Sequence, residues 1–267
     1  MKRVVLIVGL FLISQLEVMA MDFYSTEDPK AYLTRLRFNY NFSWDIFEIE
    51  TKIAKDLSFY KGSNWSVGIM GSITMFIHPT SGLFGAYPVN DLYGAIGTFV
   101  NFYNVWVENL NISIQPIVHE SSHIADGWIN GISNIARDYS FDSNEYFNID
   151  TFYLLSGWKI FGGLAYYIYL PSKPIETMTR PLRFRFHFGT DGSVEIFPGW
   201  KLLICADIGL FYEDGPLYRK GFHPAYNFAT GFDIGSCLLL IHYESQQGLG
   251  QDFRILQQRL GIELVIP

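Results

Sequence analysis

The chain has 267 residues, of which 17% are aromatic and 17% charged, and its formal net charge is -7. This acidic balance argues against nucleic acid as a partner, because binding to a phosphate backbone needs a basic surface. The two cysteines, Cys205 and Cys237, are too few for a disulfide framework that would hold a small secreted domain together.

The first twenty residues have the features of a secretory signal peptide. Two basic residues follow the first methionine, an apolar run extends from Val4 to Ile13, and the small residue Ala20 ends the segment. The run is too short for a membrane anchor, since a spanning helix needs roughly 20 apolar residues. We therefore predict a signal peptide at residues 1–20, cleaved after Ala20, and a single domain at residues 21–267.

Beyond residue 30 the sequence alternates between apolar and polar side chains in one segment after another, which is the period of a β-strand. In the stretch RLRFNYNFS, for example, Leu36, Phe38 and Tyr40 share one face, and Arg35 and Arg37 share the other. No convincing helical period of 3.6 residues competes with this pattern. We expect about twelve strands, at residues 32–42, 46–54, 65–77, 92–103, 110–119, 146–156, 158–170, 181–190, 194–211, 224–235, 236–245 and 253–266.

The connectors between these segments alternate in length, as they do in barrels whose long loops lie on one side of a membrane. A soluble β-sandwich also alternates, but its polar face is in water, whereas a membrane barrel encloses that face and must match its charges. In the first hairpin, either plausible register sets Arg35 or Arg37 across from Glu48 or Glu50. The sequence therefore predicts an all-β transmembrane antiparallel β-barrel of about 12 strands. The long connectors are expected at residues 78–91, 120–145, 171–180, 212–223 and 246–252.

Charged side chains on the polar faces are expected to line the lumen of this barrel. They are Arg35, Arg37, Glu48, Glu50, Arg183, Arg185, His187, His242, Glu244, Arg259 and Glu263.

The stretch VHESSHIAD contains H-E-x-x-H, the zinc-binding signature of one class of metalloproteases. In those enzymes the two histidines lie one helical turn apart and bind a single metal ion. Here the preceding residues alternate as a strand, in which His119 and His123 are separated by about 13 Å. We therefore disfavour a protease and expect neither a metal ion nor a cofactor.

In a strand, His119 and Ser121 lie on one face, about 6.6 Å apart along the backbone. A histidine and a serine at this spacing can serve as base and nucleophile. If the strand is regular, the two residues continue the polar face of Asn111 and Gln115 and point into the lumen. A bulge near Pro116 reverses this, because one extra residue exchanges the two faces.

The order His119-Glu120-Ser121 resembles the H-x-S element of outer-membrane phospholipase A, a twelve-stranded barrel esterase whose histidine and serine lie on the lipid-facing wall. It is also similar to the H-x-S pair of the lipid A deacylase barrels. The phospholipase continues with S-N-G-R-S, whereas this chain reads S-S-H-I-A-D. The resemblance implies an esterase, and the departure leaves the third catalytic residue unassigned.

A longer stretch, residues 60–160, resembles a family of uncharacterised outer-membrane proteins, domain of unknown function 1207. Its hallmark is a strand that ends in H-[Q/E]-S-S-H-x-x-D, which His119, Ser121, Ser122, His123 and Asp126 match here. This resemblance implies a barrel at the bacterial surface and implies no known reaction.

Two functions are therefore expected. In the first, the barrel has a structural or surface-binding role, or passes small solutes as a minor variant, and Glu120, Ser122, His123 and Asp126 belong to a hydrogen-bond network at the rim. In the second, His119 and Ser121 hydrolyse lipid esters at the extracellular rim. If His119 and Ser121 face the lipid, the esterase is favoured; if they face the lumen, the network is favoured. Both place the chain in the outer membrane after signal peptide cleavage. The expected partners are outer-membrane lipids, the barrel assembly machinery and an extracellular ligand bound through the long loops.

Overall fold

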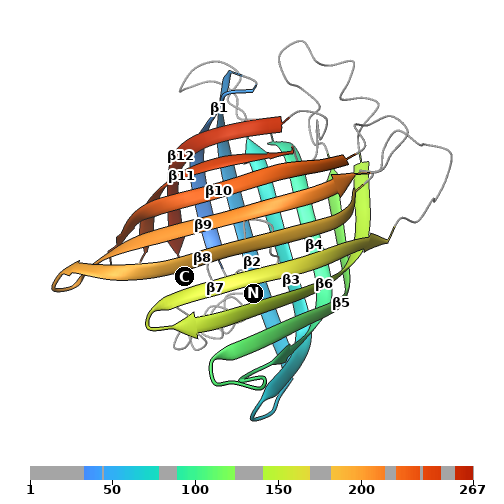
Figure 1. Ribbon diagram of the computed structural model, residues 1–267. Coiled ribbons are helices and arrows are strands. Elements are labelled where there is room, and N and C mark those ends of the chain that lie inside the picture. Colours follow the sequence, from blue (N-terminus) through green and yellow to red (C-terminus); the bar gives the residue numbers. More distant parts are fainter. Residues whose placement is uncertain are drawn as a thin grey trace, which may run out of the picture.

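The computed structural model describes residues 33–43, 45–77, 89–123, 141–168, 182–213, 221–234, 237–247 and 256–266, which form twelve antiparallel strands (Figure 1). The predicted signal peptide at residues 1–20 lies outside these ranges. The strands are β1 Leu33–Asn41, β2 Ile46–Lys61, β3 Trp65–Ile77, β4 Val89–Phe102, β5 Leu110–His123, β6 Phe141–Leu155, β7 Trp158–Ile168, β8 Leu182–Phe197, β9 Trp200–Glu213, β10 Gly221–Asp233, β11 Leu238–Gln247 and β12 Leu256–Ile266.

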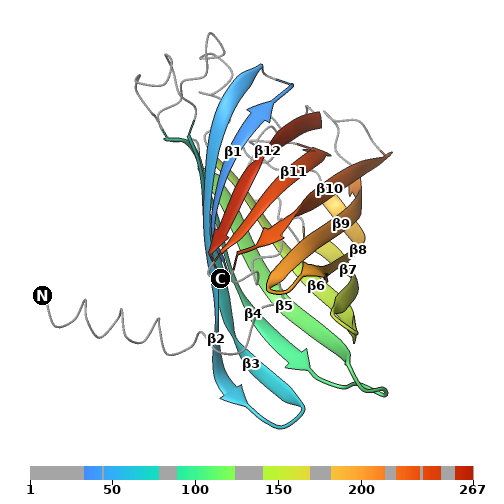
Figure 2. The ribbon, with the colours of Figure 1, turned by 90° about the vertical axis from the view of Figure 1, so that its left-hand side faces the viewer.

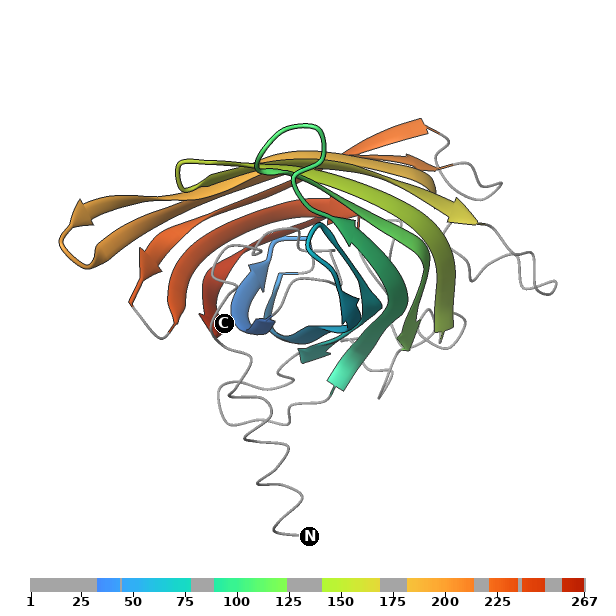
Figure 3. The same ribbon diagram turned by 90° about the horizontal axis from the view of Figure 1, so that it is seen from below.

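Each strand pairs with its neighbours in the chain, and β1 also pairs with β12, so that the sheet closes into a barrel (Figures 2 and 3). Closure leaves no unpaired sheet edge, which is what a wall surrounded by lipid requires. The predicted fold class, an all-β barrel of twelve antiparallel strands, is confirmed. Within the described residues there is no helix long and apolar enough to cross a membrane.

The wall of the barrel is apolar outside and largely polar inside. On β1 and β12 the outward side chains include Phe38 and Ile262, which are exposed, whereas the inward Arg37 and Glu263 have no exposed surface at all. A water-soluble protein has the opposite arrangement, so the apolar band is suited to contact with lipid. Arg37 pairs across the sheet with Glu50, which is one of the two registers expected for the first hairpin.

The interior also contains an apolar cluster that the alternation did not predict. It joins inward side chains from β3 to β7, β9 and β10, namely Met70, Ala95, Phe99, Val118, Tyr146, Ala165, Tyr167, Phe211 and Ala225. The alternation rule placed aromatic side chains outside, but a barrel of this strand number is narrow enough for its interior to be filled with side chains. The lumen is therefore a packed core in which charged and apolar groups occupy different regions.

Several strand boundaries differ from those expected. The second strand was expected to end at residue 54, but β2 continues to Lys61. Residues 120–123 and 141–145 were expected in a long loop, but they extend β5 and β6. The turn between β8 and β9 was expected at 191–193, but it lies at 198–199. Gly199 adopts a φ of 80°, a conformation that glycine reaches without a steric cost, while Asp191 continues β8 with its side chain buried inside.

Candidate lipid-facing site and lumen network

The HESSH stretch forms the end of β5 and pairs with strands on both sides. His119 lies opposite Ile96 of β4 and Glu145 of β6, and the ladder continues on both sides to His123. The strand expected at 110–119 continues through this segment to His123, so the segment lacks the helical turn by which a zinc protease brings its two histidines to one metal ion. The possible function of the stretch therefore depends on which of its side chains share one face of the strand.

A β-bulge at Pro116 and Ile117 decides which face His119 occupies. Against β6, the pairing steps from Gln115 to Val118 on β5 but only from Asn148 to Tyr146. The ladder with β4 shows the same extra residue on β5. Proline suits this position because it has no backbone N–H to donate to the ladder. The strand is therefore not regular, and inward and outward positions are exchanged beyond residue 117.

The exchange turns His119 to the outer wall. Before the bulge, Asn111 and Gln115 are buried in the interior; after it, Val118 and Glu120 are buried. The His119 side chain, at the alternate position, is 42% exposed. Ser121 lies two residues further on the same strand and therefore at an outward position, opposite Gly94 and Ser143.

Glu145 lies directly across the strand pair from His119, also on the outer wall. Its Oε1 is 3.4 Å from His119 Nδ1, and its side chain is 34% exposed. Glu145 was expected in a loop, and its proximity to His119 follows from the register of β5 and β6. A carboxylate at Nδ1 orients the imidazole and leaves Nε2 as the nitrogen available to a reacting group.

Charged groups are rare on this outer wall. Among the described strand side chains that point outward, three are of the types Asp, Glu, Lys, Arg or His: Lys55, His119 and Glu145. Of these, only His119 and Glu145 are adjacent to each other. Ionisable groups on a lipid-facing surface destabilise a barrel and commonly mark a functional site. The position of the pair near the end of β5, far from the tight turns, is near one rim of the barrel.

The other residues expected at the rim do not lie together on one face. Glu120 is buried inside the barrel, and Ser122 occupies the next inward position of β5. His123 occupies an outward position at the strand end, and Asp126 lies outside the described residues. The positions of the stretch therefore divide between the two sides of the wall, with 119, 121 and 123 at outward positions of β5.

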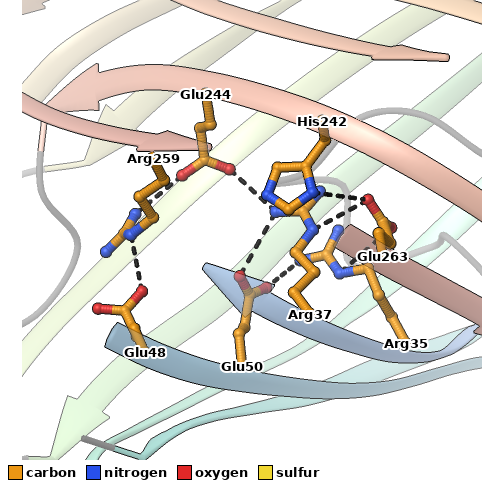
Figure 4. A network of polar contacts seen from close by, with 8 residues as sticks. All are labelled: Arg35, Arg37, Glu48, Glu50, His242, Glu244, Arg259 and Glu263. Carbon is orange, nitrogen blue, oxygen red and sulfur yellow. Dashed lines mark hydrogen bonds and ion pairs between the residues drawn. The ribbon is translucent and has the colours of Figure 1, made fainter. Parts of the chain in front are cut away.

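Charged residues fill the lumen where the barrel closes (Figure 4). Arg37 is the centre of this group: its Nε donates to Glu263 at 3.0 Å, and its Nη1 donates to Glu244 at 3.0 Å and to Glu50 at 3.4 Å. Arg35 also donates to Glu50. The group joins β1, β2, β11 and β12, and its eight members are Arg35, Arg37, Glu48, Glu50, His242, Glu244, Arg259 and Glu263.

Arg259 links the two ends of this group. Its Nη1 donates to Glu244 at 2.8 Å, and its Nε is 2.7 Å from Glu48. All these side chains are withdrawn from solvent, and each arginine faces at least two carboxylates. Each of these buried charges therefore has a partner of opposite sign, which offsets part of the cost of its removal from water.

The remaining expected lumen residues lie on the opposite side of the interior. His187 Nε2 is 3.0 Å from Asp150, which also accepts hydrogen bonds from Gln115 and Asn148. The guanidinium of Arg185 lies over the ring of Tyr146, 5.8 Å from its centroid. The side chain of Arg183 is not among those described. Asp150 is an addition to the expected set, found from its inward position on β6.

No protein-family model matches the sequence, and no curated protein matches it. Solved structures match the whole barrel. Outer membrane phospholipase A from Escherichia coli superposes with a TM-score of 0.62 and 11% identity, over 89% of this chain and 93% of that one. The calcium-bound dimer of the Salmonella typhi outer membrane phospholipase superposes with a TM-score of 0.64 and 11% identity, over 96% of both chains.

The chain has the fold of outer-membrane β-barrels. At 11% identity the likeness concerns the course of the strands and leaves the reaction to be argued from this chain's own residues. Membership of the family named domain of unknown function 1207 stays a prediction.

Proposed function

We propose that this barrel is an outer-membrane esterase that hydrolyses lipid acyl esters, with Ser121 as nucleophile, His119 as general base and Glu145 as the residue that orients His119. The observation that carries the proposal is the His119–Glu145 pair, 3.4 Å apart on an apolar outer wall. The rim network, the other expected role of this stretch, is favoured when His119 faces the lumen, and His119 lies on the outer wall instead. The phospholipase names of the similar structures fit the proposal and do not establish it.

The reaction follows from these three side chains. His119 Nε2 accepts the proton of the Ser121 hydroxyl while the oxygen attacks the ester carbonyl, and Glu145 accepts a hydrogen bond from Nδ1 and stabilises the imidazolium. The alcohol leaves with the proton that His119 returns, and the acyl group stays on Ser121. Water then attacks this acyl-enzyme with His119 again as base, which releases the fatty acid and restores the serine. The lipid remains in the membrane throughout because positions 119, 121 and 145 are outward positions of β5 and β6.

We place the barrel in the outer membrane, delivered after cleavage of the signal peptide and inserted by the barrel assembly machinery. The apolar outer wall supports this location. The His119 end of β5 then faces the cell exterior, because the long connectors are at that end and the tight turns at the other. The expected substrates are accordingly lipids of the outer leaflet.

The test is hydrolysis of phospholipid and of lipid A by the refolded barrel in mixed micelles, with and without calcium. Ser121→Ala and His119→Ala should each lower kcat by about 10²- to 10⁴-fold. Ser122→Ala is the matched control, because Ser122 is the neighbouring serine at an inward position and its loss should leave the rate near that of the unmodified barrel. A folded barrel without turnover on either lipid would refute the proposal.

A further inference from the structure

The outer wall beside Ser121 is unusually bare on one side. The residue directly across from Ser121 on β4 is Gly94, whereas the outward positions above and below it carry Leu92, 41% exposed, and Ile96, 60% exposed. A leucine at position 94 would stand about 5 Å from Ser121, close enough to cover it. On β4, the wall directly opposite position 121 therefore carries no side chain that could cover it.

The space above Gly94 is open. Among the atoms that the structure describes, a Cβ atom built there would approach one within 4 Å, the backbone oxygen of Ser72 at 3.9 Å. Two other outward glycines differ: Gly192 lies under the ring of Trp158, and Gly162 lies next to that of Phe188. Bare backbone is thus not general on this wall.

The dimensions of the opening suit one acyl chain. Leu92 and Ile96 are four residues apart, or about 13 Å along the strand, and their side chains occupy the two ends of that interval. The carbonyl carbon of a substrate must come within about 3–3.5 Å of the serine oxygen. A chain that leaves this carbonyl can lie flat over Gly94 and then pass exposed Ile73, which pairs with Gly94 on β3. The next outward position of β3 beside Ile73 is Gly71, which pairs with Ile96 and also has no side chain.

We infer that Gly94 determines the acyl specificity of this enzyme, by letting the long, unbranched acyl chain of a membrane lipid cross the wall beside Ser121. The inference rests on the proposed function. It predicts that the enzyme acts on long-chain esters and that bulk at position 94 excludes them while short-chain esters still react. Gly94 is here a specificity-determining residue, since it contributes no group to the chemistry.

The experiment compares the hydrolysis of p-nitrophenyl palmitate and p-nitrophenyl butyrate by Gly94→Leu and the unmodified barrel. The leucine has room and faces lipid, so the barrel should fold, which its altered mobility on an unheated gel will show. We expect the palmitate-to-butyrate ratio of kcat/KM to fall at least tenfold, with an intermediate ratio for Gly94→Ala. The control Thr34→Leu adds the same side chain at an exposed position of β1 and should leave the ratio unchanged.

The outcomes separate this inference from the proposed function. If the unmodified barrel hydrolyses neither ester in a Ser121-dependent manner, the proposed function fails. If it hydrolyses both and Gly94→Leu keeps the same ratio, or lowers both rates equally, the esterase stands and the role of Gly94 is refuted. A selective loss on the long chain supports both.

Discussion

The carboxylate of Glu145 is the group in the proposed site whose contribution can be separated from folding. It lies on a lipid-facing wall, where an acidic side chain opposes insertion, and it touches His119. A carboxylate at this position should give the barrel a lower free energy of unfolding than an apolar side chain would, and a higher rate of hydrolysis. Its two effects therefore have opposite signs.

Two substitutions at this position should show that opposition. We expect Glu145→Gln to lower kcat at least about tenfold with little change in KM, because the amide cannot stabilise the imidazolium. Glu145→Leu should lose activity to a similar or greater extent, yet raise the free energy of unfolding by about 1 kcal/mol. Lipid hydrolysis and urea unfolding in the same detergent measure the two effects. Stability that falls with the leucine would indicate a structural role for Glu145.

Arg37 is the residue on which the charge network at the closing strands depends. Its guanidinium reaches three carboxylates, those of Glu50, Glu244 and Glu263. Arg37→Met should destabilise the barrel by about 3–5 kcal/mol, since it leaves carboxylates buried with fewer cations. Urea unfolding followed by tryptophan fluorescence measures the loss. The exposed substitution Thr34→Ala should change stability by less than about 0.5 kcal/mol, and an equally small effect of Arg37→Met would contradict the importance of the network.

Single residues were predicted unequally well from the sequence. The pairing of Arg37 with Glu50 followed from alternation in a short hairpin, where few registers are possible. The contact of Glu145 with His119 joins positions separated by a long connector, so it depends on a register that no local pattern specifies. Glu145 itself was expected at the end of the connector 120–145, so neither its strand nor its contact was predicted.

At the scale of the element, β5 shows that the alternation is sufficient to predict a strand. It is not sufficient to predict which side chains of the strand face the lumen along its whole length. The polar face of Asn111 and Gln115 is inward, as expected, and the bulge then exchanges the faces within one residue. A proline in a strand is compatible with a bulge and also with an edge, so Pro116 alone could not settle the direction of His119. Periodicity predicts which neighbouring residues share a face of a strand, but this prediction does not hold across a bulge.

The bulge can be removed by deleting Ile117. The deletion should make β5 regular, turn positions 119 and 121 into the lumen and bring Glu120 to the outer wall. We expect the loss of lipid hydrolysis in a barrel that still folds, as judged by gel mobility. Ile117→Ala keeps the residue count, so it should retain most of the activity. Full activity in the deletion variant would mean that the site does not depend on the face that the bulge sets.

At the scale of the whole molecule, closure and strand number were predictable because the alternation recurs about twelve times and pairs of charges indicate an enclosed face. The apolar cluster inside was not, because a Phe or Tyr in an alternating segment has the same pattern whether it faces lipid or the lumen. Phe99, Tyr146 and Phe211 meet only in the closed barrel. Their positions depend on registers and bulges that act across several strands.

The filled interior has a consequence for transport. Arg37 on β1, and Gln115 and Tyr146 on the neighbouring strands β5 and β6, have no exposed surface, so a water molecule does not fit around these side chains. We therefore expect no steady ion current from the purified barrel in planar lipid bilayers, under conditions in which a general porin conducts. A passive channel needs a continuous water path, whereas charge pairs and packed aromatic rings occupy much of the described interior. A stable open current would contradict the closed lumen and return small-solute passage to consideration, whereas silence together with lipid hydrolysis would place all activity on the outer wall.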